Sequence, residues 1–280
     1  MHVLIMIIEF VYNGMFHFNN INIHYGGKEM EKLEKLYEGK AKIIYSTKDE
    51  NKVIQYFKDD ISAFDGKKKE VIENKGVLNN IISSRIFEYL EDNGINTHYI
   101  EKLNDREMLV KKCKMFPLEF VMRNITAGSI CRKYGVDEGV PIEPNILELY
   151  YKDDALGDPM MNDSHALWAT NIGPGFLGSC KHAAVKINDI LKEYFKEKNI
   201  LLIDHKIEFG WDIEAAKRTS ATDELVIIGD EISPDSCRLW DAKTNQKLDK
   251  DNFRFDLGNI SETYVKIQDA LESDNQTTTR

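Results

Sequence analysis

The stretch Leu225-Val-Ile-Ile-Gly-Asp-Glu-Ile-Ser-Pro-Asp-Ser-Cys-Arg-Leu-Trp-Asp241 decides the fold, because an apolar run in it ends directly in acidic residues. Leu225 to Ile228 is rich in β-branched residues and too short for a helix, and so it predicts a buried strand. This strand delivers Asp230 and Glu231 to its exit. Two carboxylates at a strand end suit a hard cation such as Mg²⁺, which takes oxygen ligands and shares them with substrate phosphates.

The residues that follow the acids predict a turn. Ser233-Pro234-Asp235 has turn-forming composition, and we expect it to reverse the chain. Reversal would bring Arg238 back to the strand end that carries the acids, where a guanidinium can bind a phosphate or carboxylate through paired hydrogen bonds. The alternative is that acids after a strand only cap it and form the turn.

A second apolar strand is predicted over residues 200–209. Its period of two places Asp204, Lys206 and Glu208 on one face. Such a row is often a solvated surface, but here the neighbouring strand also ends in carboxylates. If the two strands pair as a hairpin, Glu208 and Asp230 can hold one ion.

The composition limits the class of protein. A chain of 280 residues can bury a good core, in one large domain or two closely packed ones. The net charge of −10 argues against non-specific nucleic-acid binding, which needs a basic surface. The four cysteines are scattered, without metal-site or disulfide spacing, and this fits a reducing cytosol. No apolar run is long enough to span a membrane, and none reads as a secretory signal.

Residues 117–129 predict a strand followed by an anion site. The strand ends near Arg123, and Gly128-Ser129 opens a helix that Gly135 terminates. A helix N-terminus offers free N–H groups to an anion. Arg123 and Ser129 are therefore candidates for binding a phosphate.

Four motifs together resemble one enzyme family. Residues 202–210 and 229–241 look like the two C-terminal signatures of the phosphoribosylaminoimidazole-succinocarboxamide synthase (SAICAR synthetase) family, and residues 117–129 and 249–258 match two further motifs. The resemblance covers Met30 to about Ala270. It implies an α+β fold in which a smaller, sheet-rich N-terminal subdomain clamps ATP against a larger α+β subdomain. The expected limits are 30–115 for the nucleotide-clamping subdomain, 116–272 for the substrate- and metal-binding subdomain and 273–280 for a tail.

The resemblance also implies a reaction. It is the ATP-dependent ligation of L-aspartate to carboxyaminoimidazole ribotide (CAIR) in cytoplasmic de novo purine biosynthesis, which gives SAICAR, ADP and phosphate through an acyl phosphate. The implied partners are these small molecules, with neither nucleic acid nor membrane, and a homo-oligomer is allowed. Two rivals stay open: an ATP- and Mg²⁺-dependent small-molecule kinase, and a non-catalytic nucleotide-binding module.

Roles for individual residues follow from the same resemblance. Contacts to ATP are expected from Lys40, Ala41, Lys42, Lys111, Glu208 and Asp230. The last two would also hold Mg²⁺. Contacts to the substrates other than ATP are expected from Ser62, Arg123, Ser129, Asp235 and Arg238. Catalytic roles are expected for Lys40, Asp65, Asp204 and Lys206.

Two stretches and one single residue depart from the family pattern. Residues 1–29 match nothing in it, and they are either a misassigned translation start ahead of Met30 or a true extension. Residues 171–178 are full of helix breakers where the family enters a helix, and a clear amphipathic helix is expected only from Ala184. His205 stands where the family has an aromatic, and on an apolar face we expect a neutral, hydrogen-bonded histidine.

Overall fold

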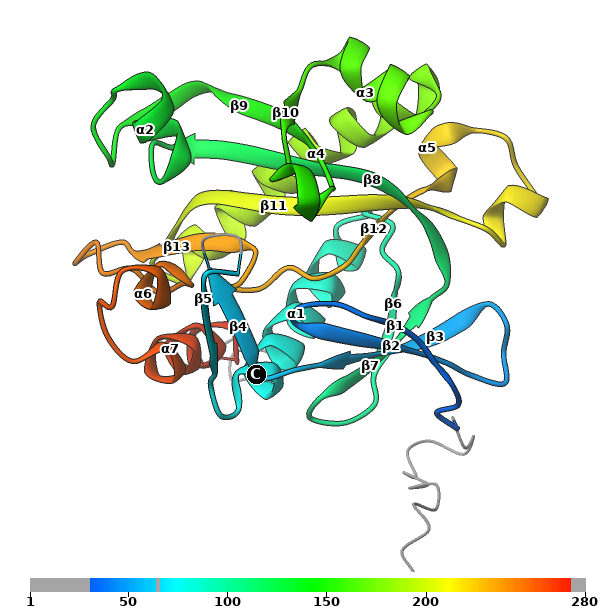
Figure 1. The fold of residues 1–280 in the computed structure, drawn as a ribbon, viewed down its shortest axis with the longest axis horizontal. Coiled ribbons are helices and arrows are strands. Elements are labelled where there is room, and N and C mark those ends of the chain that lie inside the picture. The colour runs from blue at the N-terminus through cyan, green and yellow to red at the C-terminus, as the bar shows by residue number, and fades with distance from the viewer. Residues whose placement is uncertain (1–30, 64–65, 273–280) are drawn as a thin grey trace, which may run out of the picture.

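The computed structural model describes residues 31–63 and 66–272. The N-terminal stretch 1–29, the predicted site residue Asp65 and the tail 273–280 lie outside the described residues. Figure 1 shows two antiparallel sheets with helices packed against them. The α+β class expected from the sequence is thus confirmed.

The N-terminal half of the chain forms the smaller sheet, at the lower right of Figure 1. Its five strands lie in the order β1-β2-β3-β7-β6, and all neighbours are antiparallel. A separate hairpin, β4 and β5, lies beside it. The bounds are β1 Lys35–Glu38, β2 Lys42–Ser46, β3 Lys52–Phe57, β4 Asp60–Ala63, β5 Lys68–Val71, β6 Tyr99–Lys102 and β7 Glu107–Lys111.

The larger sheet crosses the upper half of Figure 1. Its order is β10-β9-β8-β11-β12, and β13 also pairs with β11. Strand β8 is continuous over 13 residues and crosses position 115, where the two subdomains were expected to meet. The bounds are β8 Cys113–Ile125, β9 Pro141–Tyr151, β10 Met160–Met161, β11 Ile200–Asp212, β12 Val226–Gly229 and β13 Cys237–Asp241.

Strand β11 organises the larger sheet and corrects one prediction. Its C-terminal half pairs with β12, with Glu208 opposite Gly229, and its N-terminal half pairs with β13, with Asp204 opposite Arg238. The chain therefore continues in one direction through both strands, and the predicted reversal at residues 233–235 is wrong. Because β11 has 13 residues, it has room for two short partners end to end. Residues 230–236 leave the sheet between them as an excursion.

Helices pack against both sheets. α4 packs on β11 and β8, and α1 packs on the smaller sheet and on α7. α4 begins inside the stretch of expected helix breakers, because Pro174 sits in its first turn, where a missing N–H costs nothing. The bounds are α1 Lys75–Asp92, α2 Ser129–Tyr134, α3 Asp163–Thr170, η1 Asp154–Leu156, α4 Pro174–Glu197, η2 Ala215–Lys217, α5 Thr222–Leu225, α6 Asp251–Arg254 and α7 Ile260–Glu272.

One apolar core joins the two sheets. It runs from Val53 and Phe57 in the smaller sheet through Ile82 of α1 to Phe120 and Ile207 in the larger one. Burying each such side chain contributes roughly 1.5–3 kcal/mol, and so the core holds both sheets against each other. Among the described helices, none is both long enough and apolar enough to cross a membrane.

Candidate active site

A cavity of about 600 Å³ lies where the β1–β2 hairpin faces the larger sheet. Its walls come from that hairpin, from β8 and β11 and from the excursion 230–236. Most residues predicted from the sequence line it: Lys40, Ala41, Lys42, Ser62, Arg123, Ser129, Asp204, Lys206, Glu208, Asp230, Asp235 and Arg238. Lys111 does not line this cavity, and its Nζ donates to the carbonyl of Thr97 at 3.1 Å.

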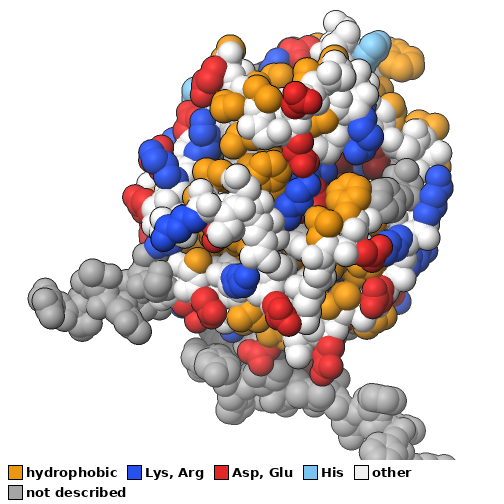
Figure 2. All heavy atoms as spheres, turned by 90° about the vertical axis from the view of Figure 1, so that its left-hand side faces the viewer, with side chains coloured by type: hydrophobic (Ala, Val, Ile, Leu, Met, Phe, Trp, Pro, Cys, Tyr) orange, Lys and Arg blue, Asp and Glu red, His pale blue; other side chains and the backbone are white. Residues whose placement is uncertain are grey.

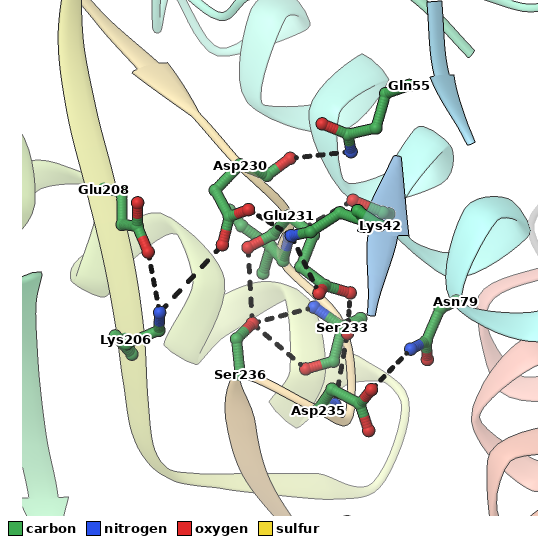
Figure 3. Close-up of polar contacts among 12 residues, drawn as sticks. Lys42, Gln55, Asn79, Lys206, Glu208, Asp230, Glu231, Ser233, Asp235 and Ser236 are labelled. Atoms are coloured by element: carbon green, nitrogen blue, oxygen red, sulfur yellow. Dashed lines mark hydrogen bonds and ion pairs between the residues drawn. The ribbon is translucent and has the colours of Figure 1, made fainter. Parts of the chain in front are cut away.

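One end of the cavity is an ion-pair network at the exit of β12, drawn in Figure 3. Lys42 Nζ contacts Asp230 and lies 3.0 Å from Glu231 Oε1. Lys206 Nζ lies 2.8 Å from Glu208 Oε1 and 4.0 Å from Asp230 Oδ2. Glu119 Oε1 also lies 2.8 Å from Lys206 Nζ, so that these two ammonium groups and four carboxylates share one small space, and Asp230 faces both lysines.

The charges in this network hold each other in the ionised form. Burial alone would lower the pKa of Lys42, but attraction to Asp230 and Glu231 outweighs it and raises that pKa above its usual value. Lys206 follows the same rule, since Glu208 raises its pKa against the effect of burial. For Asp230, burial would raise the pKa, but Lys42 and Lys206 bring it below its ordinary range. All three groups are charged at neutral pH.

The acidic side of this network fits a Mg²⁺ ion. Glu208 lies on β11 and Asp230 directly follows the neighbouring strand β12, and both face the ammonium of Lys206, which shows that the space between them favours a positive charge. No cluster of three or more His, Cys, Asp or Glu able to hold a metal occurs within residues 31–63 and 66–272. If Mg²⁺ binds there, Glu208 and Asp230 would supply two carboxylates, and phosphates and water would complete the shell, as is usual for Mg²⁺.

Two further lysines reach the same end of the cavity. Lys40 Nζ lies 2.5 Å from Asp154 Oδ1, and their side chains are 55% and 68% exposed. An ion pair this exposed contributes little stability, and so an incoming phosphate can replace Asp154 at small cost. Lys152 contacts Glu208 from the β9 side.

The opposite end of the cavity is built on Arg123. Its side chain is only 5% exposed and donates from Nε to Glu148 at 2.9 Å and from NH1 to Asp204 at 2.7 Å. NH2 donates to Ser129 Oγ at 3.0 Å, at the start of α2. The structure thus brings Arg123 and Ser129 together, and their role in binding a phosphate stays a prediction.

Arg238 lies next to this group. Its NH1 donates to both oxygens of Asp204, at 3.1 and 2.9 Å, and its Nε donates to Asp251 Oδ2 at 3.0 Å. Gly128 has a φ of +65°, and a Cβ atom there would stand only 2.4 Å from Arg238 NH2. Glycine at 128 is therefore required both by the backbone and by the guanidinium packed against it.

Asp235 lines the cavity, but its carboxylate is bound by the scaffold. Oδ2 accepts from Lys75 Nζ at 2.6 Å and from Asn79 at 3.0 Å, and Oδ1 accepts from Tyr264 at 2.7 Å. Burial would raise the pKa of Asp235, but Lys75 lowers it below its usual range. These bonds tie the excursion 230–236 to α1 and α7, and a direct contact of Asp235 with substrate stays a prediction.

Comparison with known proteins places this geometry in a family. The profile of the SAICAR synthetase family matches residues 35–271, which is most of the chain. The chain belongs to the SAICAR synthetase family. Curated relatives include the phosphoribosylaminoimidazole-succinocarboxamide synthases of Clostridium beijerinckii, 52% identical over 85% of this chain and 97% of the relative, and of Persephonella marina, 48% identical over 87% and 98%.

Solved structures of SAICAR synthetases share the fold. The enzyme from Ehrlichia chaffeensis superposes with a TM-score of 0.80 at 45% identity, over 85% of this chain and 98% of that one. A SAICAR synthetase in complex with ADP superposes with a TM-score of 0.79 at 43% identity, over 85% and 97%. The family, the fold and the ligase class expected from the sequence are confirmed.

Sequence reasoning missed two basic residues of this SAICAR synthetase cavity. Lys250, directly before α6, and Arg254, on α6, line it next to Asp235 and Arg238. Burial lowers the pKa of Lys250, although attraction to Asp235 opposes the shift. Both lie in the quoted motif 249–258, but a four-residue helix shows no periodicity from which a common face could be predicted.

His205 lies on the face of β11 that points away from the cavity, as predicted. It is fully buried, and its Nε2 lies 3.2 Å from Oδ1 of Asn188 on α4. Burial lowers its pKa to about 4, and so the imidazole is neutral at pH 7. Asn188 also exchanges hydrogen bonds with Asn124 of β8. His205 is part of a buried polar network under the sheet.

We expect His205→Phe to lower stability without changing catalysis. Phenylalanine cannot bond Oδ1 of Asn188, but that oxygen still accepts from Asn124, and so the cost is that of one lost hydrogen bond, about 0.5–1.5 kcal/mol. The free energy of unfolding in urea should therefore fall by that amount, while kcat stays within about twofold. A drop of kcat by about 100-fold, the scale of a lost general acid or base, would contradict the placement of this residue.

Proposed function

We propose that the cavity joins L-aspartate to CAIR at the expense of ATP and releases SAICAR, ADP and phosphate. The observation that carries this proposal is the row Asp204, Lys206, Glu208 on one face of β11, which connects the acidic end of the cavity to its arginine end. Alternate residues of a strand lie about 6–7 Å apart. A nucleotide phosphate at Glu208 and a ribotide at Asp204 would thus meet at Lys206.

The chemistry proceeds in two displacements. A carboxylate oxygen of CAIR attacks the γ-phosphorus of ATP, the bond to the β-phosphate oxygen breaks, and ADP leaves. The amine of L-aspartate then attacks the carbonyl carbon of the resulting acyl phosphate. The carbon–oxygen bond breaks, phosphate leaves with one oxygen of the former carboxylate, and the amine loses a proton. Holding the reactants in line and neutralising charge supply most of the rate enhancement.

The nucleotide end carries the phosphates. Lys40 and Lys42 bind them, with Ala41 between them, and Lys111 stands near the nucleotide on the smaller sheet. Asp230 and Glu208 hold Mg²⁺, which when bound neutralises phosphate charge and polarises the transferred group. The charged Lys206 stabilises negative charge where phosphate and carboxylate meet.

The ribotide end of the cavity binds CAIR. Arg123, Ser129 and Arg238 bind anionic oxygens of CAIR, with Asp235 and Ser62 at the rim of the same space. Asp204 is bonded to both arginines, and this supports a role in orienting them and the reacting carboxylate. Asp65 is proposed as a further catalytic residue from the family motif alone.

The same proposal covers the setting of the enzyme. Residues 30–115 form the subdomain that clamps the nucleotide, and residues 116–272 form the one that binds the ribotide and the metal. The enzyme works in the cytoplasm on small molecules. A homo-oligomer stays a prediction.

An isotope experiment tests the acyl phosphate directly. CAIR labelled with ¹⁸O in its carboxylate is turned over with ATP, Mg²⁺ and L-aspartate, and the released phosphate is analysed by mass spectrometry. We expect one ¹⁸O atom in each phosphate, because the carbon–oxygen bond breaks in the second step. Unlabelled phosphate alongside normal SAICAR formation would contradict this route.

A further inference from the structure

Asp251 stands behind the two arginines that α6 and β13 present to the cavity. Its side chain is only 1% exposed, and it does not line the cavity. Oδ2 accepts from Arg238 Nε at 3.0 Å, and Oδ1 contacts NH1 of Arg254. One buried carboxylate thus bridges two guanidinium groups whose other faces meet the cavity.

The bridge leaves Arg238 a single orientation. Its NH1 is bonded to Asp204 and its Nε to Asp251, while its NH2 packs on the backbone of Gly128. A free arginine side chain has rotamer entropy to lose on binding. In this arrangement the fold has already removed that freedom. The binding of an anionic substrate therefore does not have to overcome this entropy cost.

Asp251 is itself held in place. Its backbone N–H donates to Asp249 Oδ1 at 2.7 Å, and Asp249 Oδ2 accepts from the N–H of Leu239 at 2.8 Å. Leu239 follows Arg238 on β13. The carboxylate of Asp251 is therefore fixed relative to the very strand that carries the arginine it orients.

We propose that Asp251 is a positioning residue for the ribotide: it aims Arg238 and Arg254 as a pair at one anionic group of that substrate. It touches no substrate itself. This inference rests on the proposed function, since it assigns the ribotide to the arginine end of the cavity. A purely structural role, in which Asp251 only anchors α6, would affect both substrates alike.

The test compares the KM values for the two substrates in Asp251→Asn. Asparagine keeps the shape but loses the charge that holds both guanidiniums. We expect the KM for CAIR to rise about 10-fold or more, with the KM for ATP within twofold of wild type. Asp241→Asn is the matched control, because Asp241 caps an exposed turn at the other end of β13, and it should leave both KM values unchanged.

A double variant separates positioning from anchoring. In an Arg238→Lys background, Asp251→Asn should raise the KM for CAIR by a smaller factor than in wild type, because one of the two side chains it orients is already gone. Factors that simply multiply would overturn the inference, as would equal rises in both KM values.

Two safeguards keep the result interpretable. If Asp251→Asn does not fold, Asp251→Glu retains the charge but displaces it by one methylene, and an unchanged KM for CAIR in that variant would overturn the inference. If wild type shows no aspartate-dependent ADP release, the proposed function fails instead. Normal wild-type turnover with an unaffected Asp251→Asn variant would remove only the positioning role.

Discussion

Asp230→Asn should abolish turnover and leave the fold intact. The substitution removes the carboxylate proposed to bind Mg²⁺, which also faces Lys42 and Lys206, and losing one preorganised electrostatic contact of this kind costs about 10²–10³ in kcat. The backbone tolerates the change, because Asp230 has a φ of +62°, a region that asparagine adopts more readily than most residues. Asparagine also keeps the size of the side chain.

The measurement is kcat over a Mg²⁺ titration, with circular dichroism to confirm the fold. Asp256→Asn is the matched control: Asp256 also has a positive φ, at 53°, but it is exposed and does not line the cavity. The control should keep wild-type kcat. Near-normal activity of Asp230→Asn at low Mg²⁺ would show that the metal assignment is wrong.

Arg238→Lys should weaken ribotide binding more than ATP binding. Lysine keeps the charge but loses the planar fork, and it cannot satisfy Asp204 and Asp251 in the same geometry. The expected loss is about 1–3 kcal/mol, the scale of a charge-assisted hydrogen bond. This corresponds to a rise in the KM for CAIR of roughly 5- to 150-fold.

Steady-state kinetics with each substrate varied in turn measures this effect. Arg85→Lys on α1 is the control, since Arg85 pairs only with the half-exposed Glu88 among the described residues and does not line the cavity. An unchanged KM for CAIR with a raised KM for ATP would reverse the assignment of the two cavity ends.

The site on β11 could be predicted from the sequence because its signal is local. Period-two alternation places Asp204, Lys206 and Glu208 on one face whatever the rest of the chain does. The same argument places His205 on the buried face. It could not find Asn188 as the partner of His205, because that contact joins a strand to a helix, and only packing brings the two together.

The course of the chain after β12 could not be predicted in the same way. A Ser-Pro-Asp turn signal shows that the strand stops, but not whether the next strand returns beside it or continues along the same neighbour. In the structure β11 is long enough to pair with both strands, and the chain continues along it from β12 to β13. As a result Arg238 reaches the opposite end of the cavity from Asp230.

The burial of charged residues could not be predicted from the sequence either. Lys75 at the start of α1 reads as an ordinary helix-end lysine, yet it is fully buried against Asp235. Pro174 reads as a breaker, yet it starts α4. In both cases the residue type is compatible with more than one position in a fold, and the tertiary structure determines which position it has.

The central claim, that this cavity is a ligase site, is tested most directly by ADP release. ATP, Mg²⁺ and CAIR are incubated with and without L-aspartate, and ADP and SAICAR are quantified together. We predict that sustained ADP release requires L-aspartate and matches SAICAR formation one to one. Sustained ADP release without L-aspartate, together with a stable phosphorylated product, would contradict the claim and identify a kinase.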